Sequence, residues 1–309
     1  MTDRVPVTRA LISLSDKSGL DRLAAGLAEL GVEIVSTGGT AARLRDNGAQ
    51  VRDVSELTGF PEMMDGRVKT LHPKVHGALL GVRDNDEHMA AMAEHGIAAI
   101  DLVVVNLYPF EATLARGAGR DEIIENIDIG GPSMVRSAAK NHAHVAIITD
   151  PADYDELLAE LRQNGGATSL DFRKRLAAKA FALTAAYDSM ISQWFAFGDQ
   201  QQRWPESWTF SSKLKMPLRY GENPHQQAAY YRETTHRGGS LSDATLLQGR
   251  LPTFNDLLDL DTAYRIATDF TGPTCCIAKQ RNPTGLASND RLSEAYVKAL
   301  EGDPVSALT

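Results

Sequence analysis

The apolar run at residues 102–105 (LVVV), within the segment DLVVVNL at 101–107, most constrains what this chain can fold into. A strand with one solvated face alternates apolar and polar side chains, whereas a strand covered on both faces is apolar throughout. Strands of the second kind occur almost only in parallel sheets that carry helices on both faces. The sequence therefore predicts an α/β domain with a buried parallel strand at 101–107.

Strand-like and helix-like segments alternate around this run through the first 150 residues. Residues 9–14, 33–36 and 144–149 are further short apolar runs. Leucines recur at helical spacing between residues 20 and 30, and a second short helix is expected after a Gly-Gly turn. This alternation predicts a parallel sheet flanked by helices.

A long helix is expected next. From Phe172 to Trp194, apolar residues recur every three or four positions, which is typical of a helix that buries one stripe. Thr168 and Asp171 have the spacing of a capping box at its start.

The composition changes after this helix. Residues 199–212 are polar and typical of a linker, so we place a domain boundary near residue 200. The predicted domains are 1–200 and 201–309. In the second domain, the pattern predicts helices near 256–269 and 289–301 and a strand at 274–278.

The net charge of −8 over 309 residues disfavours a protein that coats nucleic acid, because such binding depends on Lys and Arg. The two cysteines, Cys275 and Cys276, are adjacent, which disfavours a disulfide between them and fits a reducing compartment. The N-terminus lacks the apolar core of a signal peptide, and no apolar run is long enough to span a bilayer. We therefore expect a soluble cytoplasmic protein without nucleic-acid or membrane partners.

Four loop segments carry the residues best suited to chemistry: 36–40 (STGGT), 66–73 (GRVKTLHP), 106–109 (NLYP) and 128–133 (DIGGPS). The first has glycines before a helix, which suits an anion, and the second places two cations beside a Gly. The third ends the buried strand, where ligands of open α/β sheets bind. Plain explanations remain open for each: a tight turn, an exposed basic loop, a packed tyrosine and compensation of a helix dipole.

Asp128 precedes the helix that the Gly-Gly-Pro sequence is expected to start, and Lys140 shares a face of that helix with Ser133. A carboxylate and an amine in one cleft could transfer protons. His72 and His76 have the spacing of a zinc pair, but Pro73 disfavours a regular helix through them and a third ligand is not evident. We expect no metal site.

The four segments, together with residues 13–17 (SLSDK) and 56–62 (ELTGFPE), closely resemble in order and spacing the family of bifunctional purine biosynthesis proteins. Members join an IMP cyclohydrolase domain to an AICAR transformylase domain. The resemblance implies a methylglyoxal-synthase-like (MGS-like) α/β domain, followed here by an incomplete α/β transformylase domain of the cytidine-deaminase-like type.

The resemblance also implies site residues. Lys69, Tyr108, Asp128 and Lys140 match the family's catalytic positions. Positions around the nucleotide are matched by Ser13, Ser15, Lys17, Ser36, Gly38, Gly39, Thr40, Arg67, Thr70, Asn106, Ile129 and Gly130.

The implied substrate is the formylated aminoimidazole carboxamide ribotide (5-formamidoimidazole-4-carboxamide ribotide), whose carboxamide nitrogen attacks its own formyl carbon to give IMP and water. Our hypothesis is that Asp128, with Tyr108, manages the carboxamide proton, while Lys69 and Lys140 stabilise the oxyanion and assist the loss of water. The cyclohydrolase needs no metal or redox cofactor.

The second half resembles the transformylase domain with departures. Arg219, Tyr220 and Lys279 match its pattern, but Gln280 stands where a proton-transferring histidine is expected, and Thr284 replaces a cysteine. A Gln cannot take up a proton near neutral pH. The family also continues beyond residue 309, so we expect a truncated domain and doubtful transformylase activity.

The family implies 10-formyltetrahydrofolate as the transformylase cosubstrate and a homodimer built largely through the transformylase domains. Two alternatives remain on the same fold: a methylglyoxal synthase, and a nucleotide-sensing regulatory module without catalysis.

Overall fold

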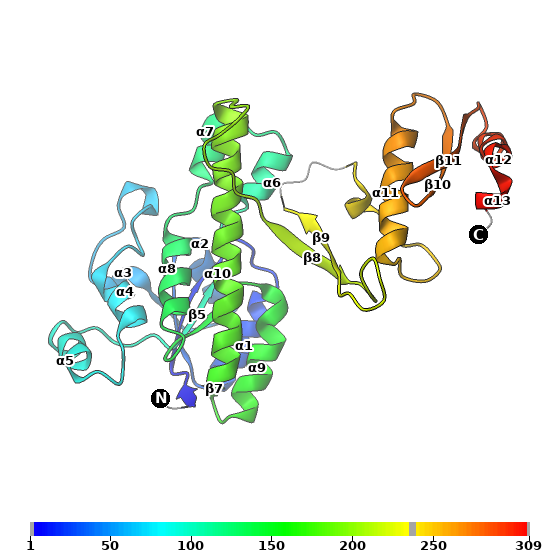
Figure 1. The fold of residues 1–309 in the computed structure, drawn as a ribbon. Helices are drawn as coiled ribbons and strands as arrows, with labels where there is room; N and C mark the ends of the chain where they lie inside the picture. The colour runs from blue at the N-terminus through cyan, green and yellow to red at the C-terminus, as the bar shows by residue number, and fades with distance from the viewer. Residues whose placement is uncertain (1–2, 235–238, 308–309) are drawn as a thin grey trace. The chain divides into compact units, whose positions relative to one another are not determined.

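In the computed structural model, which describes residues 3–234 and 239–307, the chain forms two compact units, Met1–Thr209 and Phe210–Thr309. The first unit is built on a five-stranded parallel sheet in the order β4-β3-β2-β5-β6 (Figure 1). Its strands are β2 (Arg9–Ser13), β3 (Glu33–Ser36), β4 (Val51–Asp53), β5 (Leu102–Val105) and β6 (Ala146–Ile148). All four residues of β5 are buried, which confirms the prediction of a strand covered on both faces.

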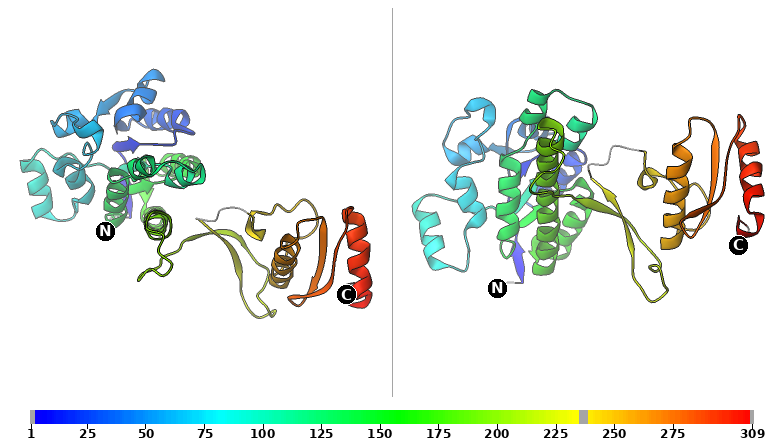
Figure 2. Two further views of the ribbon diagram at one scale, coloured as in Figure 1. Left: turned by 90° about the horizontal axis from the view of Figure 1, so that it is seen from above. Right: turned by 45° about the horizontal axis from the view of Figure 1, so that its top comes forward.

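Helices cover both faces of this sheet. α1 (Leu20–Glu29) links β2 to β3 and contacts α9 (Tyr154–Gln163). α4 (Pro73–Leu80), α8 (Gly130–Lys140) and α10 (Leu170–Gln193) form a second group in which α8 contacts both others. Parallel crossovers are right-handed. The crossover from β2 to β3 through α1 and the crossover from β5 to β6 through α8 run in opposite directions across the sheet, so α1 and α8 cover opposite faces. Figure 2 shows both groups of helices from two further directions.

Shorter elements complete the first unit. They are α2 (Gly38–Asp46), α3 (Val54–Thr58), η1 (Met64–Gly66), α5 (Asp86–Glu94), α6 (Phe110–Ala115), α7 (Arg120–Glu125), η2 (Pro151–Asp153) and η3 (Trp194–Asp199).

The long helix begins one residue later than the predicted capping box. Its cap is Ser169, whose hydroxyl accepts a hydrogen bond from the N–H of Phe172 at 3.4 Å. Thr168 instead lies in β7 (Ala167–Ser169), which pairs antiparallel with β1 (Arg4–Pro6). The Thr168 hydroxyl and carbonyl oxygens both accept hydrogen bonds from Arg173, so they do not cap the helix.

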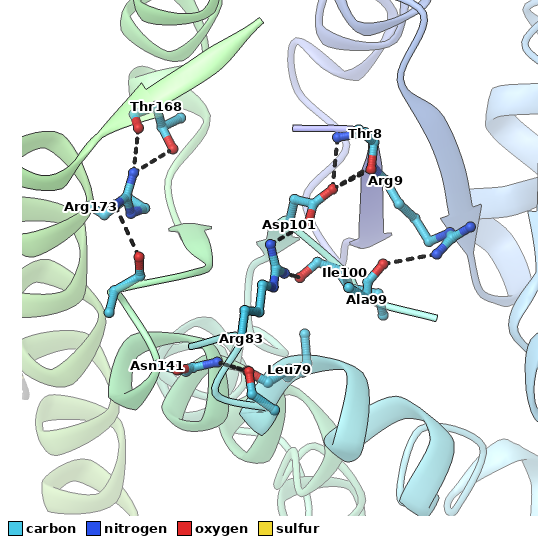
Figure 3. Close-up of polar contacts among 12 residues, drawn as sticks. Thr8, Arg9, Leu79, Arg83, Ala99, Ile100, Asp101, Asn141, Thr168 and Arg173 are labelled. Atoms are coloured by element: carbon cyan, nitrogen blue, oxygen red, sulfur yellow. Dashed lines mark hydrogen bonds and ion pairs between the residues drawn. The ribbon is translucent and has the colours of Figure 1, made fainter. Parts of the chain in front are cut away.

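A buried carboxylate joins the starts of β2 and β5 at the amino edge of the sheet (Figure 3). Asp101 accepts hydrogen bonds from the N–H and hydroxyl of Thr8 at 2.7 and 2.6 Å and from the N–H of Arg9 at 3.0 Å. The Arg83 guanidinium pairs with its other oxygen at 2.7 Å. Nearby, Asn141 at the end of α8 donates to the carbonyl oxygen of Leu79 at the end of α4, at 2.7 Å. These contacts stabilise the edge opposite to the strands' carboxyl ends.

The second unit combines two antiparallel hairpins with helices. Its elements are β8 (Ser212–Pro217), β9 (Ala229–Glu233), η4 (Leu241–Asp243), α11 (Phe254–Thr268), β10 (Thr274–Lys279), β11 (Asn282–Ser288), α12 (Leu292–Gly302) and α13 (Pro304–Ala307). The predicted strand and both predicted helices are present with bounds shifted by a few residues. Several large apolar side chains of this unit are exposed, among them Leu247, Leu251 and Tyr296.

Among residues 3–234 and 239–307, we find no helix with both the length and the apolar character required to cross a bilayer.

Candidate active site at the carboxyl edge of the sheet

Three loops meet where β2, β3 and β5 end. Asn106, directly after β5, accepts hydrogen bonds from the N–H groups of Ser15 and Asp16 at 2.7 and 3.0 Å and donates to the Asp16 carbonyl at 2.7 Å. Ser13 lies within hydrogen-bond distance of Thr37, with 3.0 Å between their hydroxyl oxygens. Neighbouring parallel strands therefore bring three of the predicted substrate residues, Ser13, Ser15 and Asn106, to one edge.

Residues 36–40 form the turn from β3 into α2. The hydroxyl of Ser36 donates to the Ile12 carbonyl at 2.7 Å, and the Thr40 hydroxyl bonds both the N–H and the carbonyl of Leu14. Both side chains are buried, so they hold the loop in place. Gly38 and Gly39 lie in the first turn of α2, where a helix leaves N–H groups without intrahelical acceptors. Such N–H groups suit a phosphate.

Lys69 reaches this turn from the loop after η1. Its Nζ lies 3.2 Å from the point that a Cβ on Gly38 would occupy, so a side chain there would crowd the ammonium group. The Glu62 carboxylate lies 4.0 Å from Nζ, and Lys69 is about one-third exposed. The structure thus places a positive charge directly beside the glycine turn.

Asp128 ends the loop before α8 and is half-buried. Its Oδ1 accepts a hydrogen bond from the N–H of Gly131 at 2.8 Å, and the Tyr108 N–H also bonds the carboxylate. Burial raises the pKa of Asp128 above its usual value, while these two hydrogen bonds and the positive charge of Lys69 act in the opposite direction. A carboxylate with a raised pKa is suited to accept a proton near neutral pH.

Tyr108 lies between Asn106 and α6. Burial raises the pKa of the Tyr108 phenol, and the negative charges of Asp128 and Glu125 raise it further. With its pKa raised, the phenol is protonated at neutral pH. The residue is 46% exposed, so the phenol is also accessible. It can donate a hydrogen bond to a ligand.

The loop of Lys69 and the loop of Asp128 lie against each other. The Thr70 hydroxyl is 2.7 Å from where a Cβ on Gly130 would stand, so Gly130 permits the close approach. Arg67, from the Lys69 loop, forms an ion pair with Glu125. Ile129, directly before α8, is 62% exposed. The structure therefore brings the two loops together with their predicted substrate residues.

Lys140 is the exception. It is the last residue of α8, whereas Asp128 lies just before the first turn of that helix. Ten residues of helix separate Gly130 from Lys140, which corresponds to about 15 Å. The adjacent Asn141 bonds the end of α4 at the amino edge of the sheet (Figure 3). The expectation that Asp128 and Lys140 converge on one cleft is wrong, because they lie at opposite ends of the helix.

A cavity of about 160 Å³ adjoins Lys69 on the side of α3. Its lining includes Thr37, Gly38, Phe60, Glu62 and His72. The Phe60 and His72 rings are 6.1 Å apart between centroids.

The two histidines at zinc spacing have other contacts. His72 Nδ1 accepts a hydrogen bond from the N–H of Lys74 at 3.1 Å and so caps α4. His76 Nδ1 lies 3.1 Å from the Ser137 hydroxyl oxygen. Among the residues that the structure describes, no cluster of three or more His, Cys, Asp or Glu could hold a metal ion.

Two residues of the site escape sequence reasoning. A Cβ on Gly131 would clash with the Asp128 carboxylate, so any larger residue there would displace that carboxylate. Tyr187 of α10 accepts a hydrogen bond from the Asp128 N–H at 2.9 Å. In the sequence Tyr187 belongs to the apolar stripe of the long helix, which indicates only a core position.

In the second unit, Gln280 and Arg281 form the two-residue loop between β10 and β11, with φ values of 51° and 64°. The Asp259 carboxylate accepts hydrogen bonds from both of their N–H groups, at 3.2 and 2.6 Å. Arg281 lies 3.9 Å from Glu222, two residues after Tyr220. The segments of Arg219, Tyr220, Lys279 and Gln280 are therefore neighbours.

Comparison with known proteins supports this description. The family model described as "AICARFT/IMPCHase bienzyme" matches residues 138–308, and the model of an MGS-like domain matches residues 19–133. The second match, together with the parallel sheet, confirms the MGS-like α/β fold predicted for the first domain.

Curated relatives match nearly the whole chain. Bifunctional purine biosynthesis proteins PurH of Cereibacter sphaeroides and Ruegeria pomeroyi are each 57% identical to it over 99% of its length. A crystal structure of ForH is 40% identical with a TM-score of 0.54, and the match covers 61% of this chain and 96% of that one. The chain spans 58% of the length of these two PurH relatives. On the family match and these identities, the chain belongs to the AICARFT/IMPCHase bienzyme family.

Proposed function

We propose that the first unit is an IMP cyclohydrolase, which closes the purine ring of 5-formamidoimidazole-4-carboxamide ribotide to give IMP and water. The observation that carries the proposal is the meeting of the Asp128 loop and the Lys69 loop beside the glycine turn of α2. This arrangement places a half-buried carboxylate, an ammonium group and an anion-binding turn around one region.

Ring closure requires a proton acceptor, because a carboxamide nitrogen is a poor nucleophile until its proton is removed. As the new bond forms between this nitrogen and the formyl carbon, Asp128 takes the nitrogen's proton. Burial raises the Asp128 pKa, which makes the carboxylate a stronger base than an exposed aspartate. Because the reaction is intramolecular, fixing the two groups in contact supplies much of the rate.

The formyl oxygen becomes negatively charged when the C–N bond forms. It leaves as water when the C–O bond breaks, with one proton that Asp128 took from the carboxamide nitrogen and a second proton from the formamido nitrogen, which forms the C=N bond of the new ring. Lys69 stabilises this oxyanion through its charge, and Tyr108 donates a hydrogen bond from a phenol that remains protonated. The N–H groups of Gly38 and Gly39, with Lys17 and Arg67, hold the ribotide phosphate. The proposed step uses no metal or redox cofactor.

Lys140 has no place in this mechanism, because it lies at the far end of α8. We propose Lys69, Tyr108 and Asp128 as the catalytic residues.

For the second unit we propose that transformylase chemistry with 10-formyltetrahydrofolate is impaired. Gln280 occupies the β10–β11 turn at the position where the family carries its proton-transferring histidine, and an amide side chain cannot accept that proton. We expect the protein to work in the cytoplasm as a homodimer, as the family resemblance implies.

The test is to incubate the purified chain with the formylated ribotide and follow IMP by its absorbance. Lys69→Met removes the charge at similar volume and should lower turnover by about 10²-fold or more. Lys174→Met, at an exposed position on α10, is the matched control and should leave turnover unchanged. Methylglyoxal release from a triose phosphate would indicate a methylglyoxal synthase. IMP binding without turnover would indicate the regulatory module. Either result would overturn the proposal.

A further inference from the structure

The loop that ends in Asp128 is held by a hydroxyl group of α10. Tyr187 Oη accepts a hydrogen bond from the N–H of Asp128 at 2.9 Å. The same hydroxyl donates to the carbonyl oxygen of Asn126 at 3.0 Å. One side chain thus bonds two backbone groups of the loop and ties both to the long helix.

Tyr187 is itself held rigidly. Its side chain is 3% exposed and packs edge-on against Phe110, with ring centroids 6.0 Å apart. Phe110 in turn packs edge-on against Trp194 at 6.3 Å. These rings belong to a hydrophobic cluster separate from the main core of the sheet. Since Phe110 follows Tyr108 by two residues, one cluster supports both loops that carry proposed catalytic groups.

The Asp128 carboxylate itself accepts two hydrogen bonds, one from the start of α8 and one from a neighbouring loop. The N–H of Gly131 lies three residues away, and the N–H of Tyr108 belongs to the neighbouring loop. These bonds set the carboxylate relative to the start of α8 and the Tyr108 loop, whereas Tyr187 ties the backbone of the Asp128 loop to α10. Burial raises the pKa of Tyr187 to about 12, so its hydroxyl keeps the proton that it donates to Asn126.

We propose that Tyr187 is a positioning residue for ring closure: through the backbone of Asp128 it orients the carboxylate that takes the carboxamide proton. This inference rests on the proposed cyclohydrolase function. Tyr187 acts through Asp128, because its own side chain is buried.

The experiment compares Tyr187→Phe with Tyr154→Phe in the full chain. Both substitutions remove one buried phenol oxygen and keep the ring. The Tyr154 hydroxyl, however, has no hydrogen-bond partner among the residues that the structure describes. We expect Tyr187→Phe to lower kcat by about 10- to 100-fold, the loss typical of a displacement near 1 Å. KM should change by less than about threefold, because the phosphate is held elsewhere. Tyr154→Phe should leave both constants unchanged.

A second measurement does not depend on turnover. Hydrogen exchange at the amide of Asp128, followed by mass spectrometry of peptides that span residues 126–128, should be faster in Tyr187→Phe than in the parent chain. It should be unchanged in Tyr154→Phe.

The outcomes separate the two proposals. An active parent chain with an unaltered kcat in Tyr187→Phe overturns the positioning role, as does a loss of kcat that Tyr154→Phe shares. A parent chain that forms no IMP overturns the proposed function. In that case, the exchange rate alone decides whether Tyr187 holds the loop, and an unchanged rate rejects it.

Discussion

Replacing Gly131 by alanine should strongly reduce turnover while lowering stability only modestly. Gly131 lies in the first turn of α8, where alanine would ordinarily favour the helix by about 0.8–1.0 kcal/mol. The added Cβ would instead stand 2.9 Å from Asp128 Cγ and 2.9 Å from Leu107 Cδ2. Carbon atoms in contact normally lie about 3.5–4.0 Å apart, so the Asp128 carboxylate must move by about 1 Å.

This displacement sets the expected magnitude. A misplacement of about 1 Å in a catalytic group costs roughly 10²-fold in rate. At about 1.36 kcal/mol for each factor of ten, that corresponds to about 2.7 kcal/mol of activation free energy. Overpacking costs about 1–3 kcal/mol of folding stability, offset in part by the helix preference of alanine. The net loss in the free energy of unfolding should thus be roughly 0–2 kcal/mol.

The assay is the rate of IMP formation at saturating ribotide, with thermal unfolding followed by circular dichroism. Gly26→Ala is the matched control, because its Cβ would lie 2.5 Å from Leu158 Cδ2 and 2.8 Å from Leu158 Cδ1 on α9, on the face of the sheet opposite to α8. It should show a comparable change in stability with normal turnover. Equal kcat values for Gly131→Ala and the parent chain would show that the Asp128 carboxylate does not need its observed position.

Further predictions concern charge, pH and the opposite edge of the sheet. Lys140→Met should reduce kcat less than Lys69→Met does, and an equal or greater loss would place Lys140 in the reaction despite its distance. The acidic limb of the pH profile of kcat/KM should have its midpoint above the usual aspartate pKa of about 3.9, because burial raises the pKa of Asp128 and the protonated form cannot act as the base; a midpoint at or below 3.9 argues against Asp128. Asp101→Ala should lower the free energy of unfolding by about 3–5 kcal/mol in denaturant titrations, since it leaves the partly buried Arg83 without its carboxylate; a loss below 1 kcal/mol would show that this ion pair contributes little.

The central strands could be predicted because they are apolar throughout, and β5 is the clearest case. Among the three-residue strands, β6 lies in a predicted apolar run, but β1, β4 and β7 could not be predicted. β4 has a pattern of partly buried and exposed residues, and its pairing with β3 determines it more than its own composition does. The capping box at Thr168 was misplaced by one residue because Arg173, fully buried, takes up the Thr168 oxygens.

In the candidate site, too, some residues could be predicted from the sequence and others could not. Lys69, Tyr108 and Asp128 lie in loops that follow strands or precede helices, where sequence order indicates the edge of the sheet. Helical spacing correctly predicted that Lys140 lies on the helix that starts at Gly130. The expectation of one cleft overlooked the length of this helix, which separates its two ends by roughly 15 Å. Tyr187 acts across 59 residues of sequence, and only the folded chain reveals its contact with Asp128.

The most direct measurement is the single-turnover rate of ring closure in the parent chain and in Asp128→Asn, with Asp155→Asn, a surface aspartate that pairs with Arg22, as the control. An asparagine keeps the shape of the side chain but cannot take up the carboxamide proton. We predict IMP formation by the parent chain and by Asp155→Asn, and a loss of at least about 10²-fold in Asp128→Asn. Ring closure at the parental rate in Asp128→Asn would contradict the assignment of Asp128 as the base.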